Sequence, residues 1–279
     1  MARKAPFLER TSRRAAIVSG RSLKTFTGSR PKHRSVFLHM PKCGGTSLSE
    51  AMYATVPFYE RIGVIDAVAT RRAAGIVHFD RDDPWVCHED LENGQKVFDL
   101  REQMLLQHMA WDTMLIHGHV LWSERAAAHF GDLYKFVTLL RDPVERTVSN
   151  MRMAQRAGLV GDDPEAYLQS DVARRQARVF LRYLAGRNDI AEGDLADATA
   201  LATQRLEKFA VVGFLDRFEA FNARYREIFG VRLAMRRLNA APDQMPDLEE
   251  TFLDRLRALC APDIEIYEAA LERAARGGA

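Results

Sequence analysis

The sequence predicts an α/β fold in which a central parallel sheet, P-loop-like in its order of elements, is flanked by helices. Helical patterns separate short apolar runs that are typical of strands buried on both faces of a sheet. Strands alternating with helices in this way favour parallel pairing. These runs are residues 35–40, 114–119, 134–140 and 209–214. A Gly-rich turn after the first run is the third observation, because such turns open helices that bind phosphate.

The other elements follow from periodicity and capping signals, and residues 60–100 are mixed. A loop at 41–46 separates the first strand from a helix, and Asp142 and Pro143 mark the start of another helix as its N-cap and first residue. The C-terminal third is mostly helical and is expected to pack on the sheet. The predicted helices are 47–55, 101–109, 123–129, one starting at 143, 164–185, 194–207, 216–229, 247–259 and 262–276.

Composition limits the class of protein. The 279 residues contain no run of about 18 apolar residues, so no membrane-spanning helix is expected. The three cysteines are an odd number without metal-type spacing, which argues against a disulfide framework and favours a reducing, cytoplasmic setting.

Charge is distributed unevenly along the chain. Residues 1–34 hold ten Lys or Arg and one acid, a net charge of +9, while the remainder carries −7. We predict that residues 1–34 form a flexible basic arm and that residues 35–279 form one domain. Contact of the arm with nucleic acid or with an anionic membrane stays open as an alternative. The acidic remainder argues against nucleic acid as a general partner.

The turn after the first strand reads "HMPKCGGTS" and has the features of an anion site. Gly44 and Gly45 allow close approach of the backbone to a phosphate, and Lys42 adds a positive charge. Ser47 and Glu50 have the spacing of a capping box, which places the helix start at 46 or 47. Lys42 precedes the glycines, so the order differs from the Gly-Lys-Ser/Thr of nucleoside triphosphatases. An ordinary strand–helix turn is the alternative.

A second anion motif, "LLRDPVERTVS", follows the strand at 134–140. Arg141 stands at the strand tip, and Ser149 follows within the next helix, so both can contribute donors to one phosphate. Arg146 is open between an anion contact and a structural ion pair.

Histidines lie between the two motifs. His117 and His119 are two residues apart on a predicted strand and therefore project to one face. Histidine is suited to remove a hydroxyl proton near neutral pH. Zinc ligation and a purely structural pair are the alternatives, and no complete metal site is predicted.

The two anion motifs and the His-Gly-His segment together resemble the sulfotransferase superfamily, and more narrowly carbohydrate O-sulfotransferases of the heparan sulfate 2-O-sulfotransferase type. The resemblance implies 3′-phosphoadenosine 5′-phosphosulfate as donor and 3′-phosphoadenosine 5′-phosphate as product, without a metal. It places the 5′-phosphosulfate on the first loop and the 3′-phosphate on Arg141 and Ser149. The implied residues of the loop are Lys42, Cys43, Gly44, Gly45, Thr46 and Ser47. Cys43 departs from the residue usual in the family.

The expected activity is transfer of a sulfuryl group to a hydroxyl of a carbohydrate or glycan-like acceptor. His119 is the preferred base, His117 assists it, and Lys42 meets the charge on the leaving phosphate. Related carbohydrate sulfotransferases use a glutamate after the first loop, and here Glu50 occupies that place. The alternative function is an ATP-dependent kinase for a small molecule or nucleotide.

Overall fold

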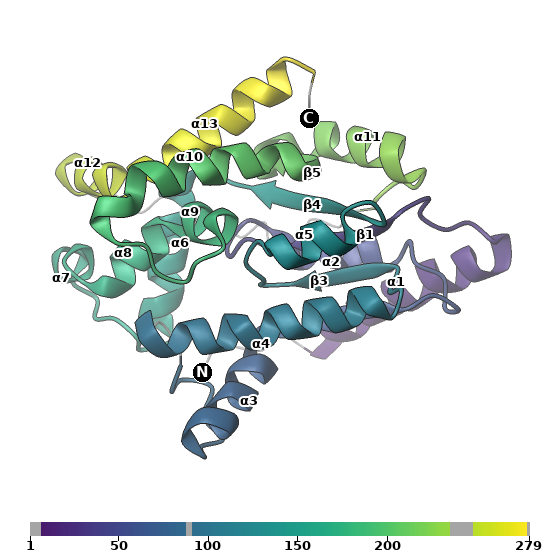
Figure 1. Ribbon diagram of the computed structural model, residues 1–279, viewed down its shortest axis with the longest axis horizontal. Coiled ribbons are helices and arrows are strands. Elements are labelled where there is room, and N and C mark those ends of the chain that lie inside the picture. Colours follow the sequence, from purple (N-terminus) through teal and green to yellow (C-terminus); the bar gives the residue numbers. More distant parts are fainter. Residues whose placement is uncertain (1–6, 88–90, 235–247, 278–279) are drawn as a thin grey trace.

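The computed structural model describes residues 7–87, 91–234 and 248–277 of the chain. A five-stranded sheet forms its core, with helices around it (Figure 1). The strand order is β2-β3-β1-β4-β5, and every pairing is parallel. The prediction of a parallel sheet flanked by helices is thereby confirmed. The strands are β1 (Arg34–Leu38), β2 (Ile62–Ile65), β3 (Leu115–Gly118), β4 (Tyr134–Leu140) and β5 (Phe209–Phe214).

Helices enclose the sheet on both sides (Figure 1). Those in the N-terminal half are α1 (Phe7–Thr27), α2 (Gly45–Tyr53), α3 (Ala67–Phe79), α4 (Leu91–Ala110), α5 (Glu124–Phe130) and α6 (Pro143–Arg156). Those that follow are α7 (Pro164–Leu168), α8 (Asp171–Ala177), α9 (Val179–Ala185), α10 (Leu195–Arg205), α11 (Phe218–Phe229), α12 (Glu250–Leu259) and α13 (Ala261–Ala275).

Alternation along the central strands divides the core into two layers. Val36 and Leu38 of β1 belong to the cluster that also contains residues of α4, α5, α9, α10 and α13. Phe37, between them, belongs to the cluster formed with α2 and α11. Successive side chains of a strand point to opposite faces, so a strand that is apolar throughout needs cover on both sides. The helical C-terminal part provides some of that cover, as predicted, through Ile266 and Ala270 of α13.

The N-terminal segment differs from its prediction. We predicted a flexible arm over residues 1–34, whereas residues 7–27 form α1, which packs on α2. The Arg13 guanidinium donates from Nε to both carboxylate oxygens of Glu50 (2.9 Å each). A Cβ added to Gly20 would lie 2.6 Å from the Cβ of Ala54, the C-cap residue of α2, so the glycine permits close contact of α1 with the end of α2. These contacts lie far apart in sequence, which explains why local composition did not indicate them.

Two other predictions are corrected. The mixed segment at 60–100 contains the edge strand β2, the helix α3 and the start of α4, which extends well before the predicted residue 101. The helical pattern predicted at 164–185 is confirmed as helix but is divided into three short helices, and the Ser170 hydroxyl accepts from the Ala173 N–H to start the second of them. In the part of the chain that the structure describes, no helix is long and apolar enough to cross a membrane.

Candidate functional site

The residues predicted from the two motifs and the histidine segment lie at one edge of the sheet. Three neighbouring strands, in the order β3-β1-β4, end there. His119 follows β3, the loop with Lys42 follows β1, and Arg141 follows β4. The carboxyl edge of a parallel sheet is where ligands bind in open α/β folds, especially where the chain switches direction on either side of the first strand.

The loop after β1 has an unusual backbone. Lys42 has a φ of 64°, in the left-handed region that side chains other than glycine rarely adopt, and Gly44 has a φ of 72°. Such conformations concentrate at ligand sites, since the surrounding structure must hold them. The sequence did not indicate this conformation for Lys42.

Helix α2 begins earlier than predicted, at Gly45, with Gly44 as its N-cap and no side-chain cap. The predicted capping box of Ser47 and Glu50 is therefore wrong, because Glu50 is bound to Arg13 instead. A helix start without a side-chain cap leaves N–H groups of its first turn for another acceptor. This backbone suits an anion.

The side chains of the loop differ in access. Thr46 is exposed and Ser47 is half-buried. Cys43 is fully buried, its Sγ donates to the Pro41 carbonyl (3.6 Å), and burial raises the pKa of the thiol to about 12. Cys43 can therefore contribute to an anion site only through its backbone.

Beside the loop, three histidines and a tyrosine form one cluster. Nδ1 of His39 is hydrogen-bonded to Nε2 of His117 (2.9 Å), and Nδ1 of His117 to the Tyr53 hydroxyl (2.7 Å). The rings of His39 and His119 are stacked with centroids 4.3 Å apart. Both nitrogens of His117 are thus engaged within the protein, while its ring supports the position of His39.

His119 has a defined tautomer. Its Nδ1 lies 2.8 Å from the His39 carbonyl oxygen, which can only accept, so Nδ1 carries the hydrogen. In the neutral ring the lone pair is then on Nε2. This nitrogen is the one able to receive a proton.

Burial keeps the histidine rings neutral. It lowers the pKa of His117 to about 4 and, together with the charge of Arg101, lowers the pKa of His119 to about 3. It lowers the pKa of His39 well below the ordinary value, and the neighbouring histidines add to this effect. Arg101 is itself buried and donates to the His119 carbonyl (3.0 Å).

Sequence reasoning missed His39, Tyr53 and Arg101. His39 is the first residue after β1, so its place at the strand end was visible in the sequence. Its contact with His117, 78 residues away, was not. Tyr53 and Arg101 lie within helices whose faces become known only once the helices are docked.

Gly45 is needed for the position of His39. A Cβ at this glycine would lie 2.0 Å from Cδ2 and Nε2 of the His39 ring. We expect Gly45→Ala to displace the ring and lower the free energy of unfolding by about 1–3 kcal/mol, measured by urea denaturation. Gly161→Ala is the matched control, because nothing lies within 4 Å of its added Cβ. Equal stability of the two variants would contradict the close packing of His39 on Gly45.

The second motif separates into an accessible and a buried part. Arg141 keeps a fifth of its side chain exposed and forms an ion pair with Glu145 (3.2 Å). Asp142 caps α6 by accepting from the Glu145 N–H (2.9 Å), as predicted for that helix start. Ser149 is buried within α6. An anion at Arg141 would compete with the Glu145 carboxylate.

Arg146 takes the structural role that the sequence left open. It is fully buried, forms an ion pair with Asp263 of α13 (3.3 Å) and donates to the Gln176 carbonyl (2.7 Å). Asp263 also accepts from the N–H groups of Phe180 and Leu181. This pair connects α6, α9 and α13 and does not face an anion site.

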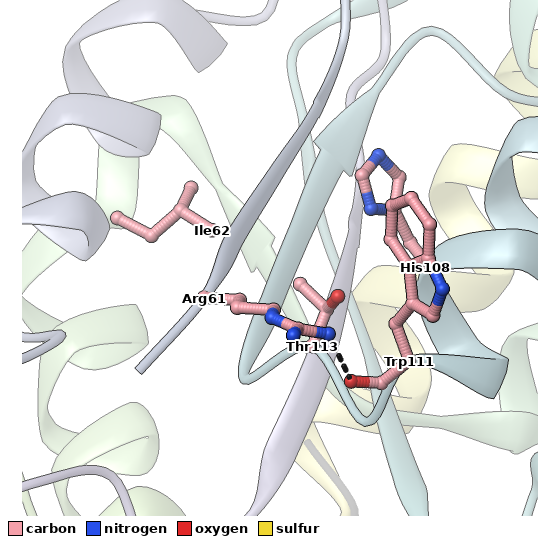
Figure 2. A pocket seen from close by; sticks show the side chains of 5 residues that line it. All are labelled: Arg61, Ile62, His108, Trp111 and Thr113. Atoms are coloured by element: carbon pink, nitrogen blue, oxygen red, sulfur yellow. Dashed lines mark hydrogen bonds between the residues drawn. The ribbon is translucent and has the colours of Figure 1, made fainter. Parts of the chain in front are cut away.

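A cavity lies away from these residues, at the amino ends of β2 and β3 (Figure 2). It is an open hollow of about 560 Å³ in which Arg61, His108 and Trp111 lie close together. Arg61 donates to the Trp111 carbonyl (3.3 Å), so its charge is already engaged. The cavity belongs to the opposite edge of the sheet from the loop and the histidines.

Metal ligation was the alternative for the histidines. Among residues 7–87, 91–234 and 248–277, no group of three or more His, Cys, Asp or Glu side chains is placed to hold a metal ion. The ring nitrogens are engaged with one another and with the backbone instead: His39 Nδ1 with His117 Nε2, and His119 Nδ1 with the His39 carbonyl.

No protein-family model matches the chain, and no curated protein matches it either.

Proposed function

We propose that this protein transfers a sulfuryl group from 3′-phosphoadenosine 5′-phosphosulfate to a hydroxyl of a carbohydrate. The observation that carries the proposal is the arrangement along three adjacent strand ends: a base candidate after β3, an anion loop after β1 and an arginine after β4. We infer on the same ground that the fold is P-loop-like, with the first strand at the centre of the sheet. The three cysteines are buried and form no disulfide, which fits the cytoplasmic setting included in the proposal.

The anion-binding parts divide between the two phosphates of the donor. Lys42 and the N–H groups at the start of α2 would hold the 5′-phosphosulfate, with Thr46 and Ser47 as further donors. Arg141 would hold the 3′-phosphate. The resemblance assigns Ser149 to the same phosphate, and its hydroxyl, buried within α6, would have to become accessible to bind it. Two separate anion sites suit a donor with phosphates at both ends of its ribose.

His119 would act as the base that accepts the proton of the acceptor hydroxyl. Its Nε2 would take the hydroxyl proton as the acceptor oxygen forms its bond to sulfur. The bond from sulfur to the bridging oxygen breaks, and Lys42 stabilises the charge left on the phosphate. The negative donor nearby would raise the pKa of His119 from about 3 and make it a stronger base. His117 assists by position: its two nitrogens are hydrogen-bonded to His39 and Tyr53, and the His39 ring stacks on that of His119.

The choice of a carbohydrate is supported by the surroundings of His119. Arg101 donates both to the His119 carbonyl and to the Ala67 carbonyl, and Nε of Arg71 donates to that same Ala67 oxygen (3.1 Å). The Arg71 guanidinium lies 5.6 Å from the centre of the Trp85 ring, which is about half exposed. An exposed indole beside a cation offers a sugar an apolar face and a polar partner.

The test is detection of sulfated products by mass spectrometry after incubation with the donor and a panel of glycans. Thermal shift in the same series compares 3′-phosphoadenosine 5′-phosphate with ATP and Mg²⁺, since a ligand stabilises the state that binds it. The proposal expects greater stabilisation by the former. Greater stabilisation by ATP and Mg²⁺ would favour the alternative, a kinase.

The pH profile should reflect the lowered pKa of the base. His119 acts when unprotonated, so activity is lost only as the pH falls through its pKa. We expect kcat/KM for the donor, which reports the enzyme before the donor binds, to stay level as the pH passes below about 6.5, the ordinary value for histidine, and to fall only below about pH 4. Arg101→Met removes a charge that lowers this pKa, so its acid limb should move to higher pH. A wild-type limb near pH 6.5 would contradict the assignment.

Glu50 is the competing candidate for the base, and its ion pair argues against it. Because Arg13 binds both of its oxygens, Glu50→Gln should weaken the attachment of α1 but leave turnover within about threefold of wild type. Turnover with saturating donor is the measurement. A loss comparable to that of a base, about a hundredfold or more, would identify Glu50 as the proton acceptor instead.

A further inference from the structure

Helix α1 presents an apolar face to solvent. Arg13, Ile17 and Gly20 lie on the side toward the body of the protein, where Arg13 and Gly20 contact α2. The opposite side carries four apolar residues, which we call the outer face of α1: Ala15, Val18, Leu23 and Phe26. At 3.6 residues per turn these four residues span an arc of about 140°. Hydroxyl residues lie among them: Thr11, Ser12, Ser19 and Ser22. Leu23 is 60% exposed and Phe26 is 89% exposed, so large apolar side chains project into water.

The segment after α2 adds two aromatic residues beside this face. Arg21 donates to the carbonyls of Val56 and Pro57, and the Phe58 N–H donates to the Thr25 hydroxyl (2.8 Å). These bonds hold Phe58 against the C-terminal half of α1, with its ring 4.6 Å from the Arg21 guanidinium. The rings of Phe58 and its neighbour Tyr59 are about half exposed. The apolar surface therefore extends beyond the helix.

The N-terminal segment that contains α1 is also rich in positively charged residues. The first 34 residues carry a net charge of +9, against −7 for the rest. Arg14 is exposed and flanks the outer face next to Val18, whereas Lys24 lies on the side of α1 toward the body and donates to the Ser29 hydroxyl (3.3 Å). Three arginines of the segment are ion-paired with carboxylates of the body: Arg13, Arg30 and Arg34. The remaining positive charge of the segment would attract this side of the protein to an anionic surface.

We propose that the outer face of α1, with Phe58 and Tyr59, docks the protein on an anionic lipid surface. Apolar side chains on one side of a basic helix enter the headgroup region, while the cations meet lipid phosphates. The helix lies on the bilayer and does not cross it. Nucleic acid would use the cations but gives Leu23 and Phe26 no apolar partner. This inference does not rest on the proposed sulfuryl transfer.

Sedimentation of the full chain with lipid vesicles tests the proposal. We expect binding to vesicles of phosphatidylcholine mixed with phosphatidylglycerol, weaker binding as salt is added, and little binding to phosphatidylcholine alone. The double variant Leu23→Ser, Phe26→Ser should bind the anionic vesicles at least about tenfold more weakly, because it loses the inserted apolar side chains. Its circular dichroism should match wild type, since both side chains face solvent.

The matched control is Ile76→Ser, Val77→Ser on α3, which removes exposed apolar side chains far from α1 in sequence. It should bind like wild type. Equal vesicle binding by the α1 double variant would overturn the proposal, as would tighter binding to duplex DNA than to the vesicles. A wild-type dimer that the α1 double variant abolishes would also overturn it, by assigning the outer face to a second copy of the chain.

Discussion

His119→Ala is expected to lower kcat by about 10²–10⁴-fold while leaving the dissociation constant for 3′-phosphoadenosine 5′-phosphate unchanged. The reason is positional: Nδ1 of His119 is committed to the His39 carbonyl, which leaves Nε2 as the proton acceptor. The anion loop and Arg141 belong to other strand ends, so product binding does not depend on this ring. Single-turnover measurement with labelled donor separates the chemical step from binding.

His108→Ala is the matched control for this variant. His108 lines the cavity at the opposite edge of the sheet and should be replaceable with little effect on turnover. Full turnover in His119→Ala would exclude His119 as the base. Loss of product binding together with turnover would show that the substitution disturbs the loop through His39, which packs on Gly45.

Asp263→Ala should cause the largest loss of stability, about 3–5 kcal/mol in the free energy of unfolding. The substitution leaves the guanidinium of Arg146 buried without its carboxylate partner and removes the acceptor of the Phe180 and Leu181 N–H groups. Two of the Arg146 nitrogens, Nε and Nη1, already have no hydrogen-bond partner in the described part of the chain. Other hydrogen bonds of the guanidinium therefore offset little of the lost ion pair. Urea denaturation with constant m measures the change.

Two further variants identify the cause. Asp254→Ala breaks an exposed ion pair with Arg257 and should cost less than about 1 kcal/mol. Adding Arg146→Met to Asp263→Ala removes the unpaired charge and should restore part of the lost stability. If the double variant is less stable than Asp263→Ala alone, the buried charge is not the source of the loss.

Local patterns were sufficient for the buried strands and for the motif positions. The runs at 134–140 and 209–214 coincide with β4 and β5 because each is mostly apolar on both faces, and an Asp-Pro helix start follows the first of them closely. The glycines after β1, the Asp-Pro start of α6 and the His-Gly-His segment were also identifiable, since each depends on neighbouring residues. Their common position at one sheet edge followed from parallel pairing.

The sequence could not supply contacts between distant residues. Residues 7–27 are basic enough to suggest an unstructured arm, and the contacts of Arg13 with Glu50 and of Gly20 with Ala54 place them instead as a helix on α2. Strand β2 has only four residues, and one of them is a glycine on which His108 packs. Such a segment has little strand signal of its own.

The sequence by itself determined the parallel α/β fold and the positions of the loop lysine, of the histidine pair and of Arg141, because these depend on apolar runs and residues close in the chain. Only the tertiary structure decided which histidine nitrogen is available, that His39 and Tyr53 complete the cluster, and that Arg146 is bound to an aspartate 117 residues away. A hydrogen bond between distant residues acts over about 3 Å, and folding alone brings its partners that close.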